Sequence, residues 1–317
     1  MTSRRSLSIA FAGTPAFAVP ALEALIADGY RVGPVLTQPD RRAGRGRALT
    51  PSPVKELARS HGIDVLQPTK PDAVLRDSLP PARPDFLVVI AYGLILPDWL
   101  LVWPEVAPVN VHASLLPRWR GASPIQQAVL AGDRDSGVSI MRMTAGLDTG
   151  PVYCRASTPI GARETAGSLH DRLAALGAET LVDALPAIAA GTLTTEPQDE
   201  SAACYAPKID KRDALIDWSR PAREIERRVR AYQPWPVAES TTVAGERLRI
   251  WEAELGPRET AAAPGSVVAT DRGAIEVATG DGVLVVTRLQ PPGGRAMSAK
   301  SYLAAHDLSG AVFGAPR

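Results

Sequence analysis

Three polar residues in two short segments could do chemistry together. Asn110 and His112 lie one residue apart in NVHASLLPRWRGASP, and Asp148 lies between two glycines in TAGLDTGP. In a strand, residues i and i+2 point to the same face, so Asn110 and His112 would project together. The three side chains would supply an amide donor for a developing oxyanion, an imidazole, and a carboxylate that accepts protons and orients the imidazole.

Each of these residues also has an ordinary structural explanation. The Asn-x-His pattern alone favours a hydrogen-bonded core asparagine followed by a surface histidine, and an aspartate in a glycine-rich turn is common turn chemistry. The chain has no G-x-S-x-G motif that would supply a protein nucleophile. If the three residues do converge, the substrate must bring its own nucleophile, which favours direct group transfer over a covalent enzyme intermediate.

The first 190 residues alternate apolar runs with helix-like segments. The apolar runs cover residues 6–13, 30–38, 63–68, 84–93, 107–112, 137–143 and 151–160. The helix-like segments cover residues 15–29, 52–62, 123–133 and about 164–190. Continuous apolar strands alternating with helices predict an α/β fold with a doubly wound, Rossmann-like, mostly parallel sheet. In such sheets ligands bind outside the carboxyl ends of the strands, where the run that carries Asn110 and His112 ends.

The pattern changes after Gly191. Residues 192–211 have no sustained periodicity and are typical of a linker. Beyond them, one amphipathic helix at 221–234 precedes short strand-like runs that are split by Gly, Pro and Asp, which favours a small β-barrel or sandwich. We therefore expect a catalytic domain at 1–191, a linker at 192–211 and a smaller C-terminal domain at 212–317, in keeping with the two domains that the length favours.

Bulk composition narrows the class of protein further. The chain is 45% hydrophobic and 22% charged with a net charge of +1, which excludes a uniformly basic nucleic-acid coat but allows a local basic patch. Its two cysteines lie far apart, which favours a reducing, cytoplasmic setting and argues against a zinc site. The apolar run near the N-terminus is short and stops at Gly13, so we expect neither a signal peptide nor a membrane span.

A family resemblance rests on segments spread from residue 9 to about residue 300. They are FAGTP, TQPDRRAGRGR, SPVKELA, AYGLILP, NVHASLLPRWRGASPIQ, GVSIMRMTAGLDTGPV and IDWS…AYQPWP. Together they resemble the methionyl-tRNA formyltransferases. The Asn-x-His-x-Ser-Leu-Leu-Pro and Leu-Asp-x-Gly patterns are shared by all folate-dependent formyltransferases, whereas the arginine-rich loop and the C-terminal region narrow the resemblance to the enzymes that act on tRNA.

The resemblance implies transfer of the formyl group from N10 of 10-formyltetrahydrofolate to the α-amine of methionine on initiator tRNA. It assigns catalysis to Asn110, His112 and Asp148. It places the folate beside the SLLP segment and along the AYGLILP loop, at Ser114, Leu115, Leu116, Pro117, Tyr92 and Gly93. The chain lacks a G-x-G-x-x-G fingerprint, which suits a folate better than a dinucleotide.

The loop DRRAGRGRALTP, residues 40–51, carries four arginines within seven residues. By itself such a run predicts a solvated, disordered loop. The resemblance implies instead that Arg45, with Arg42 and Arg47, contacts the acceptor stem of the tRNA, and that Lys208 makes a further phosphate contact. It also implies that the C-terminal domain is an OB-like β-barrel that binds tRNA.

We therefore predict a cytoplasmic, monomeric, two-domain formyltransferase without a metal, whose partners are folate and initiator methionyl-tRNA. A formyltransferase for a purine-pathway ribonucleotide or an amino sugar would lack the arginine loop and the C-terminal barrel. A nucleotide-dependent dehydrogenase would require the missing glycine fingerprint. A non-catalytic RNA-binding module would keep the arginine loop without needing all three polar residues.

Overall fold

The computed structural model describes residues 6–43, 48–242, 245–257 and 259–314, so Arg45 and Arg47 lie outside the described residues. The chain forms two compact units. Unit 1 takes up most of the first 206 residues, and unit 2 takes up the chain from Pro207 onward together with Ile125–Arg134 and Ile160–Leu169. The sequence-based boundaries at 191 and 211 stay predictions.

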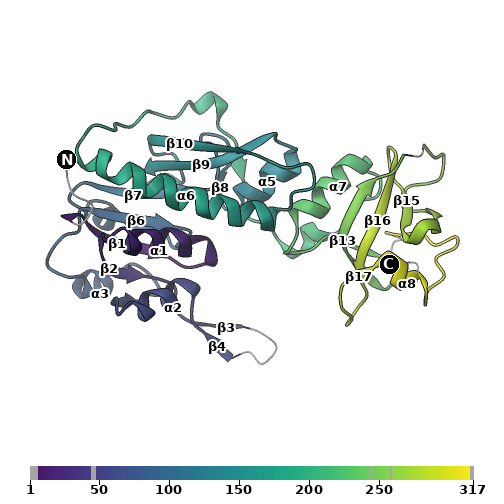
Figure 1. Ribbon diagram of the computed structural model, residues 1–317, viewed down its shortest axis with the longest axis horizontal. Helices are drawn as coiled ribbons and strands as arrows, with labels where there is room; N and C mark the ends of the chain where they lie inside the picture. The colour runs from purple at the N-terminus through teal and green to yellow at the C-terminus, as the bar shows by residue number, and fades with distance from the viewer. Residues whose placement is uncertain (1–5, 44–47, 243–244, 258, 315–317) are drawn as a thin grey trace. The chain divides into compact units, whose positions relative to one another are not determined.

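The centre of unit 1 is a sheet that has seven strands in the described part of the chain, in the order β10-β9-β7-β6-β1-β2-β5 (Figure 1). The strands are β1 (Ser8–Gly13), β2 (Arg31–Leu36), β5 (Val65–Leu66), β6 (Phe86–Ile90), β7 (Ala107–His112), β9 (Asp135–Arg142) and β10 (Val152–Pro159). The five strands from β7 to β5 run parallel, while β9 and β10 are antiparallel to their neighbours. The predicted mostly parallel α/β sheet is confirmed, whereas the reversed direction of β9 was not predicted.

Unit 1 also contains helices that connect or cover these strands. They are α1 (Val19–Ala27), α2 (Pro53–Ser60), α3 (Ala73–Ser78), α4 (Asp98–Leu101) and the larger part of α6 (Ala166–Ala189), and α5 (Pro124–Ala131) begins in the same unit. The short helices α3 and α4 were not predicted. No helix in the described residues is long and apolar enough to span a membrane.

Packing on β7 explains how its polar residues reach one face of the sheet. A Cβ added to Gly177 of α6 would lie 2.9 Å from a methyl group of Val111, so the bare glycine lets the helix pack closely on this face. Because side chains alternate along a strand, Asn110 and His112 point to the opposite face. Asn110 lies beside Val89 of β6, a member of the apolar cluster that also holds Tyr92 and Leu100.

Unit 2 contains an antiparallel sheet of six strands among the residues that the structure covers, ordered β12-β13-β16-β15-β14 with β17 paired to β16. The strands are β12 (Glu239–Thr241), β13 (Arg247–Leu255), β14 (Val267–Ala269), β15 (Ile275–Ala278), β16 (Val283–Gln290) and β17 (Met297–Ser298). Helices α7 (Ala222–Ala231) and α8 (Ala299–Leu303) pack on the sheet, whose core includes Trp218, Ile225 and Phe313. The sheet curls into a half-barrel, in agreement with the predicted OB-like fold (Figure 1).

In the described part of the chain, two short strand pairs lie outside the large sheets. The predicted arginine loop begins and ends in an antiparallel hairpin of β3 (Arg41–Ala43) and β4 (Ala48–Thr50), which the sequence did not predict. In addition, β8 (Arg120–Gly121) pairs in parallel with β11 (Tyr205–Ala206), so that the predicted linker pairs with the segment that follows His112.

Candidate active site

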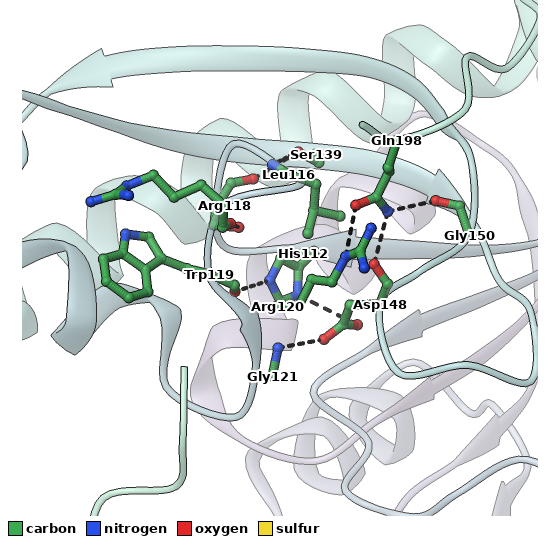
Figure 2. A network of polar contacts seen from close by, with 11 residues as sticks. His112, Leu116, Arg118, Trp119, Arg120, Gly121, Ser139, Asp148, Gly150 and Gln198 are labelled. Atoms are coloured by element: carbon green, nitrogen blue, oxygen red, sulfur yellow. Dashed lines mark hydrogen bonds and ion pairs between the residues drawn. The ribbon is translucent and has the colours of Figure 1, made fainter. Parts of the chain in front are cut away.

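His112 is the last residue of β7 and is only 6% exposed. Its Nε2 lies 2.9 Å from the carbonyl oxygen of Trp119 (Figure 2). Because a carbonyl oxygen can only accept, this contact requires the proton on Nε2 and assigns the tautomer of a neutral imidazole. Nδ1 is therefore the nitrogen that remains to exchange a proton, and it faces Oδ1 of Asp148 at 3.6 Å.

Asp148 reaches His112 from the loop between β9 and β10, residues 143–151, which we call the aspartate loop. Because β9 runs antiparallel to β7, its last residue, Arg142, lies opposite Val109 rather than opposite His112. The loop must therefore fold back, and it carries Asp148 in a left-handed conformation with φ of 52°. The second carboxylate oxygen of Asp148 accepts a hydrogen bond from the backbone N–H of Gly121 at 2.9 Å.

Asn110 occupies the same face of β7 as His112 and is 9% exposed. Within the described residues, no group donates a hydrogen bond to its side-chain amide or accepts one from it. A polar side chain at the end of a buried strand normally finds a protein partner. Asn110 thus keeps two N–H donors for a group that arrives from outside.

The segment after His112, residues 113–121, is held in one shape by hydrogen bonds within the segment and to Ser139 of β9, and we call it the proline loop. The hydroxyl of Ser114 donates to the carbonyl of Arg118 at 2.5 Å. The backbone N–H of Leu116 donates to Oγ of Ser139, which in turn donates to the carbonyl of Ser114. Leu116 is buried, whereas Leu115 and Pro117 are half-buried and keep exposed surface that a ligand could cover.

Tyr92 and Gly93, the other two residues predicted to contact folate, follow β6. The side chain of Tyr92 lies in the apolar core, where burial raises its pKa to about 12 and its hydroxyl has no hydrogen-bond partner among the residues described. The backbone of Tyr92 does make polar contacts. Its carbonyl oxygen accepts hydrogen bonds from the side chains of Thr14 and Gln38. The nearby Ile95 is 90% exposed and offers apolar surface on this loop.

The hairpin of β3 and β4 is anchored at its base by a partly buried ion pair. The ammonium of Lys55, 5% exposed, lies 2.7 Å from the carboxylate of Asp40 and also donates to Gln67. The hydrogen bond from Lys55 and a second one from the amide of Gln67 hold the pKa of Asp40 below its usual value. Arg42 is exposed on β3, and the predicted contact residue Lys208 is exposed in unit 2.

Sequence reasoning missed a second layer of polar residues behind Asp148. The amide of Gln198 donates to the carbonyls of Asp148 and Gly150, and its oxygen accepts from Arg120 (Figure 2). Arg120 also makes two hydrogen bonds to Glu200. Gln198 and Glu200 lie in the aperiodic segment that was predicted to be a linker, so no hydrophobic pattern pointed to them.

No group of three or more His, Cys, Asp or Glu side chains gathers in a metal-binding arrangement within residues 6–43, 48–242, 245–257 and 259–314. The site around His112 is built from side chains alone. It combines the amide of Asn110, which has no partner among the described residues, with the imidazole of His112 and the carboxylate of Asp148. Such a group can stabilise an oxyanion and move a proton.

Comparisons with family profiles and with curated relatives agree on one protein family. The sequence profile of the formyl transferase family matches residues 7–185, and that of the formyl transferase C-terminal domain matches residues 208–307. The chain is 53% identical to a methionyl-tRNA formyltransferase of Methylococcus capsulatus, over 97% of this chain and 100% of the relative. It is 50% identical to the protein of the same name from Nitrosococcus oceani, over 95% and 94% of the two chains.

Solved structures share the fold at low sequence identity. An N-formyltransferase from Helicobacter canadensis, in complex with folinic acid and dTDP-3-aminofucose, matches with a TM-score of 0.68 and 17% identity over 88% of this chain and 98% of its own. HypX from Aquifex aeolicus, in complex with tetrahydrofolic acid, matches with a TM-score of 0.61 and 18% identity over 94% of this chain and 46% of its own.

Proposed function

This chain belongs to the formyl transferase family and is a transferase, and we propose that it moves the formyl group of 10-formyltetrahydrofolate to the α-amine of methionyl initiator tRNA. One observation carries the chemistry. The Asp148 carboxylate lies 3.6 Å from Nδ1 of His112, and the amide of Asn110, which has no partner among the described residues, projects from the same face of β7. The choice of acceptor rests on the curated relatives that match almost the whole chain.

In the proposed reaction the free amine of the methionyl ester attacks the formyl carbon of the folate. A C–N bond forms, and the carbonyl electron pair moves to oxygen. The N–H groups of Asn110 donate to that oxyanion, because they have no other partner within the described residues. His112 stabilises the same negative charge when its imidazole carries a second proton, although its Nε2–H is engaged by Trp119 in this structure.

The reaction also moves one proton from the attacking amine to the leaving nitrogen. Asp148 accepts the amine proton, directly or through a water molecule, and returns a proton toward N10 by way of the facing His112 nitrogen. The C–N10 bond then breaks as the oxyanion collapses, which leaves tetrahydrofolate and formylmethionyl-tRNA. No net proton is consumed, and no protein nucleophile is required.

The two substrates need different surfaces. We place the flat pteridine against the half-buried Leu115 and Pro117 and beside the backbone of Tyr92 and Gly93, because narrow loops with apolar sides and backbone polar groups suit a planar heterocycle. Arg42, together with Arg45 and Arg47, would contact the phosphates and unpaired bases of the acceptor stem. Lys208 and the half-barrel of unit 2 would supply further contacts to the tRNA.

The proposal also includes the domain bounds, the localisation and the oligomeric state that we expect from the sequence. We propose a catalytic domain at residues 1–191, a linker at 192–211 and a tRNA-binding domain at 212–317. A tRNA substrate implies a cytoplasmic enzyme. We propose that it acts as a monomer, which light scattering of the purified protein would check.

The test is incubation of the protein with 10-formyltetrahydrofolate and each of three acceptors. These are methionyl initiator tRNA, methionyl elongator tRNA and an amino-sugar nucleotide. We expect formylation of the initiator tRNA alone. Formylation of the amino sugar in preference to the tRNA, or no transfer to any acceptor, would contradict the proposal.

A further inference from the structure

The aspartate loop and the proline loop are bridged by residues 196–206, which we call the strap. At its start, Glu196 exchanges two backbone hydrogen bonds with Val152, each of 2.8 Å, directly after the aspartate loop. At its end, Ala206 accepts a hydrogen bond from the backbone N–H of Ala122, also at 2.8 Å. The strap therefore connects the segment that carries Asp148 with the segment that follows His112.

Between these two points the strap holds the aspartate loop through the side chain of Gln198. The side-chain nitrogen of Gln198 donates to the carbonyl of Asp148 at 2.8 Å and to the carbonyl of Gly150 at 2.7 Å (Figure 2). Asp148 is in a left-handed conformation, which residues other than glycine adopt infrequently, although aspartate tolerates it better than most. The two hydrogen bonds from Gln198 fix the carbonyls on both sides of Thr149 and so fix that conformation.

The orientation of Gln198 is itself set by Arg120. A guanidinium has donors only, so the Nε–H of Arg120 must face the amide oxygen of Gln198, at 3.0 Å. The amide nitrogen of Gln198 then has to face the two carbonyls. Glu200 holds the other two nitrogens of Arg120 at 2.8 and 2.7 Å, and this contact lowers the pKa of the Glu200 carboxyl below its usual value.

We propose that Gln198, oriented by Arg120 and Glu200, is a positioning residue that holds the Asp148 carboxylate against His112. This inference rests on the proposed function of Asp148. Gln198 lies behind the loop, and among the described residues its side chain bonds to two backbone carbonyls and to Arg120, so it acts on the reaction through Asp148. An amide is required at this position because one end must accept from a guanidinium while the other donates to two carbonyls.

The first variant to test is Gln198→Glu, which keeps the shape of the side chain and removes both N–H donors. Its carboxylate would repel the carbonyl oxygens of Asp148 and Gly150 and release the aspartate loop. We expect kcat for formyl transfer to fall about 100-fold, as a displacement of about 1 Å at a reacting group can produce. KM for the folate and for the tRNA should stay within about threefold, since uniform binding is unchanged.

Hydrogen exchange separates this role from a merely structural one. The N–H of Gly121 donates to the carboxylate of Asp148, whereas the N–H of Ala122 donates to the strap itself. In Gln198→Glu the amide of Gly121 should exchange faster while the amide of Ala122 stays protected. Loss of protection at both amides would mean that the strap has detached, and unchanged protection at Gly121 would mean that Asp148 has not moved. Either result overturns the proposal.

Two further variants complete the experiment. Gln198→Met removes the same hydrogen bonds without adding charge, and it takes the place of Gln198→Glu if that protein does not fold. Glu179→Gln is the control, because it exchanges a carboxylate and an amide at an exposed position of α6, the helix that packs on the face of β7 opposite to Asn110 and His112. We expect Glu179→Gln to keep the kcat of the unsubstituted protein, and full kcat in both Gln198 variants would overturn the proposal.

The exchange measurement also keeps the two proposals apart. If the unsubstituted protein does not formylate methionyl-tRNA, the proposed function is wrong, yet the response of Gly121 to Gln198→Glu still reports whether Gln198 positions Asp148. If the protein is active and Gly121 does not respond, only the positioning role is wrong.

Discussion

A methyl group added at Gly121 should displace the strap from the active site. Gly121 has φ of 113°, and a Cβ there would lie 2.6 Å from the carbonyl oxygen of Ala206 and 2.7 Å from the ring of Tyr205. The tyrosine ring can turn away, but the Ala206 oxygen belongs to the backbone of β11. Gly121→Ala therefore has to move β11 away from β8.

The cost of Gly121→Ala has two parts. Placing alanine at this positive φ costs about 1–3 kcal/mol. Moving β11 breaks two hydrogen bonds, from the N–H of Arg120 to Cys204 and from the N–H of Ala122 to Ala206, and each contributes about 0.5–1.5 kcal/mol. The expected destabilisation of unit 1 is the sum, about 2–6 kcal/mol. The loss of kcat should accompany it, because Gly121 donates to Asp148.

Two measurements test this prediction. Urea unfolding gives the free energy of unfolding of unit 1, and hydrogen exchange reports on the amide protons of Arg120 and Ala122. Gly62→Ala is the matched control, since Gly62 also has a positive φ, of 68°, but no other atom lies within 4 Å of its added Cβ. That variant carries only the backbone cost of about 1–2 kcal/mol. If both variants lose the same free energy of unfolding, the contact with Ala206 does not constrain the strap and the reasoning is refuted.

Three further predictions concern single groups. Asn110→Ala should lower kcat by about 10²–10³ with an unchanged melting temperature, because the amide has no protein partner in the described residues to lose; single-turnover kinetics would measure this. Tyr92→Phe should raise the free energy of unfolding by about 1 kcal/mol and remove the tyrosinate step near pH 12 in an absorbance titration, since the buried hydroxyl is unpaired among the described residues. Lys55 lowers the pKa of Asp40 in the folded protein, so the ion pair stabilises the fold fully above the usual carboxyl pKa of 3.8. This stabilisation is lost as the pH falls through the lowered pKa of Asp40. The urea midpoint of Asp40→Asn should therefore lack this part of the acid dependence.

The parts of the fold that follow hydrophobic periodicity were predictable from the sequence. The apolar run that ends in Asn110 and His112 predicted a strand at 107–112, and β7 has those bounds. Its neighbour Val111 faces the core under α6, which is why an alternating pattern could assign the two polar residues to one face. The half-barrel was predictable for the same reason, from short apolar runs separated by turn residues.

The antiparallel direction of β9 could have been predicted from the length of the loop that follows it. The predicted strands at 137–143 and 151–160 are separated by fewer than ten residues, whereas a parallel connection needs a crossover of about a dozen or more. Loop length therefore predicts an antiparallel pair. Once β9 is antiparallel, the carboxyl end of the strand cannot bring Asp148 to His112, and the return path of the aspartate loop has to do so.

The strap could not have been predicted from a sequence pattern, because it contacts the site through polar groups rather than through apolar side chains. Gln198 acts on backbone carbonyls, and Ala206 is bound through its own backbone, so neither interaction requires an apolar side chain at a regular spacing. Periodicity detects residues that bury apolar surface. A segment that contributes through polar contacts to irregular backbone is indistinguishable from a linker by that criterion.

The difference between Asn110 and Asp148 explains why the site needs this segment. Asn110 belongs to a buried central strand, and its position follows from the packing of the sheet. Asp148 lies on an exposed loop outside regular secondary structure, so its position depends on hydrogen bonds from Gln198 and Gly121, outside the loop. A substitution in the strap should therefore impair the proton transfer that we propose for Asp148, while the oxyanion contact that we propose for Asn110 is retained. This separation predicts that Gln198→Glu and Asn110→Ala lower kcat by different routes, so their effects should multiply in the double variant rather than overlap.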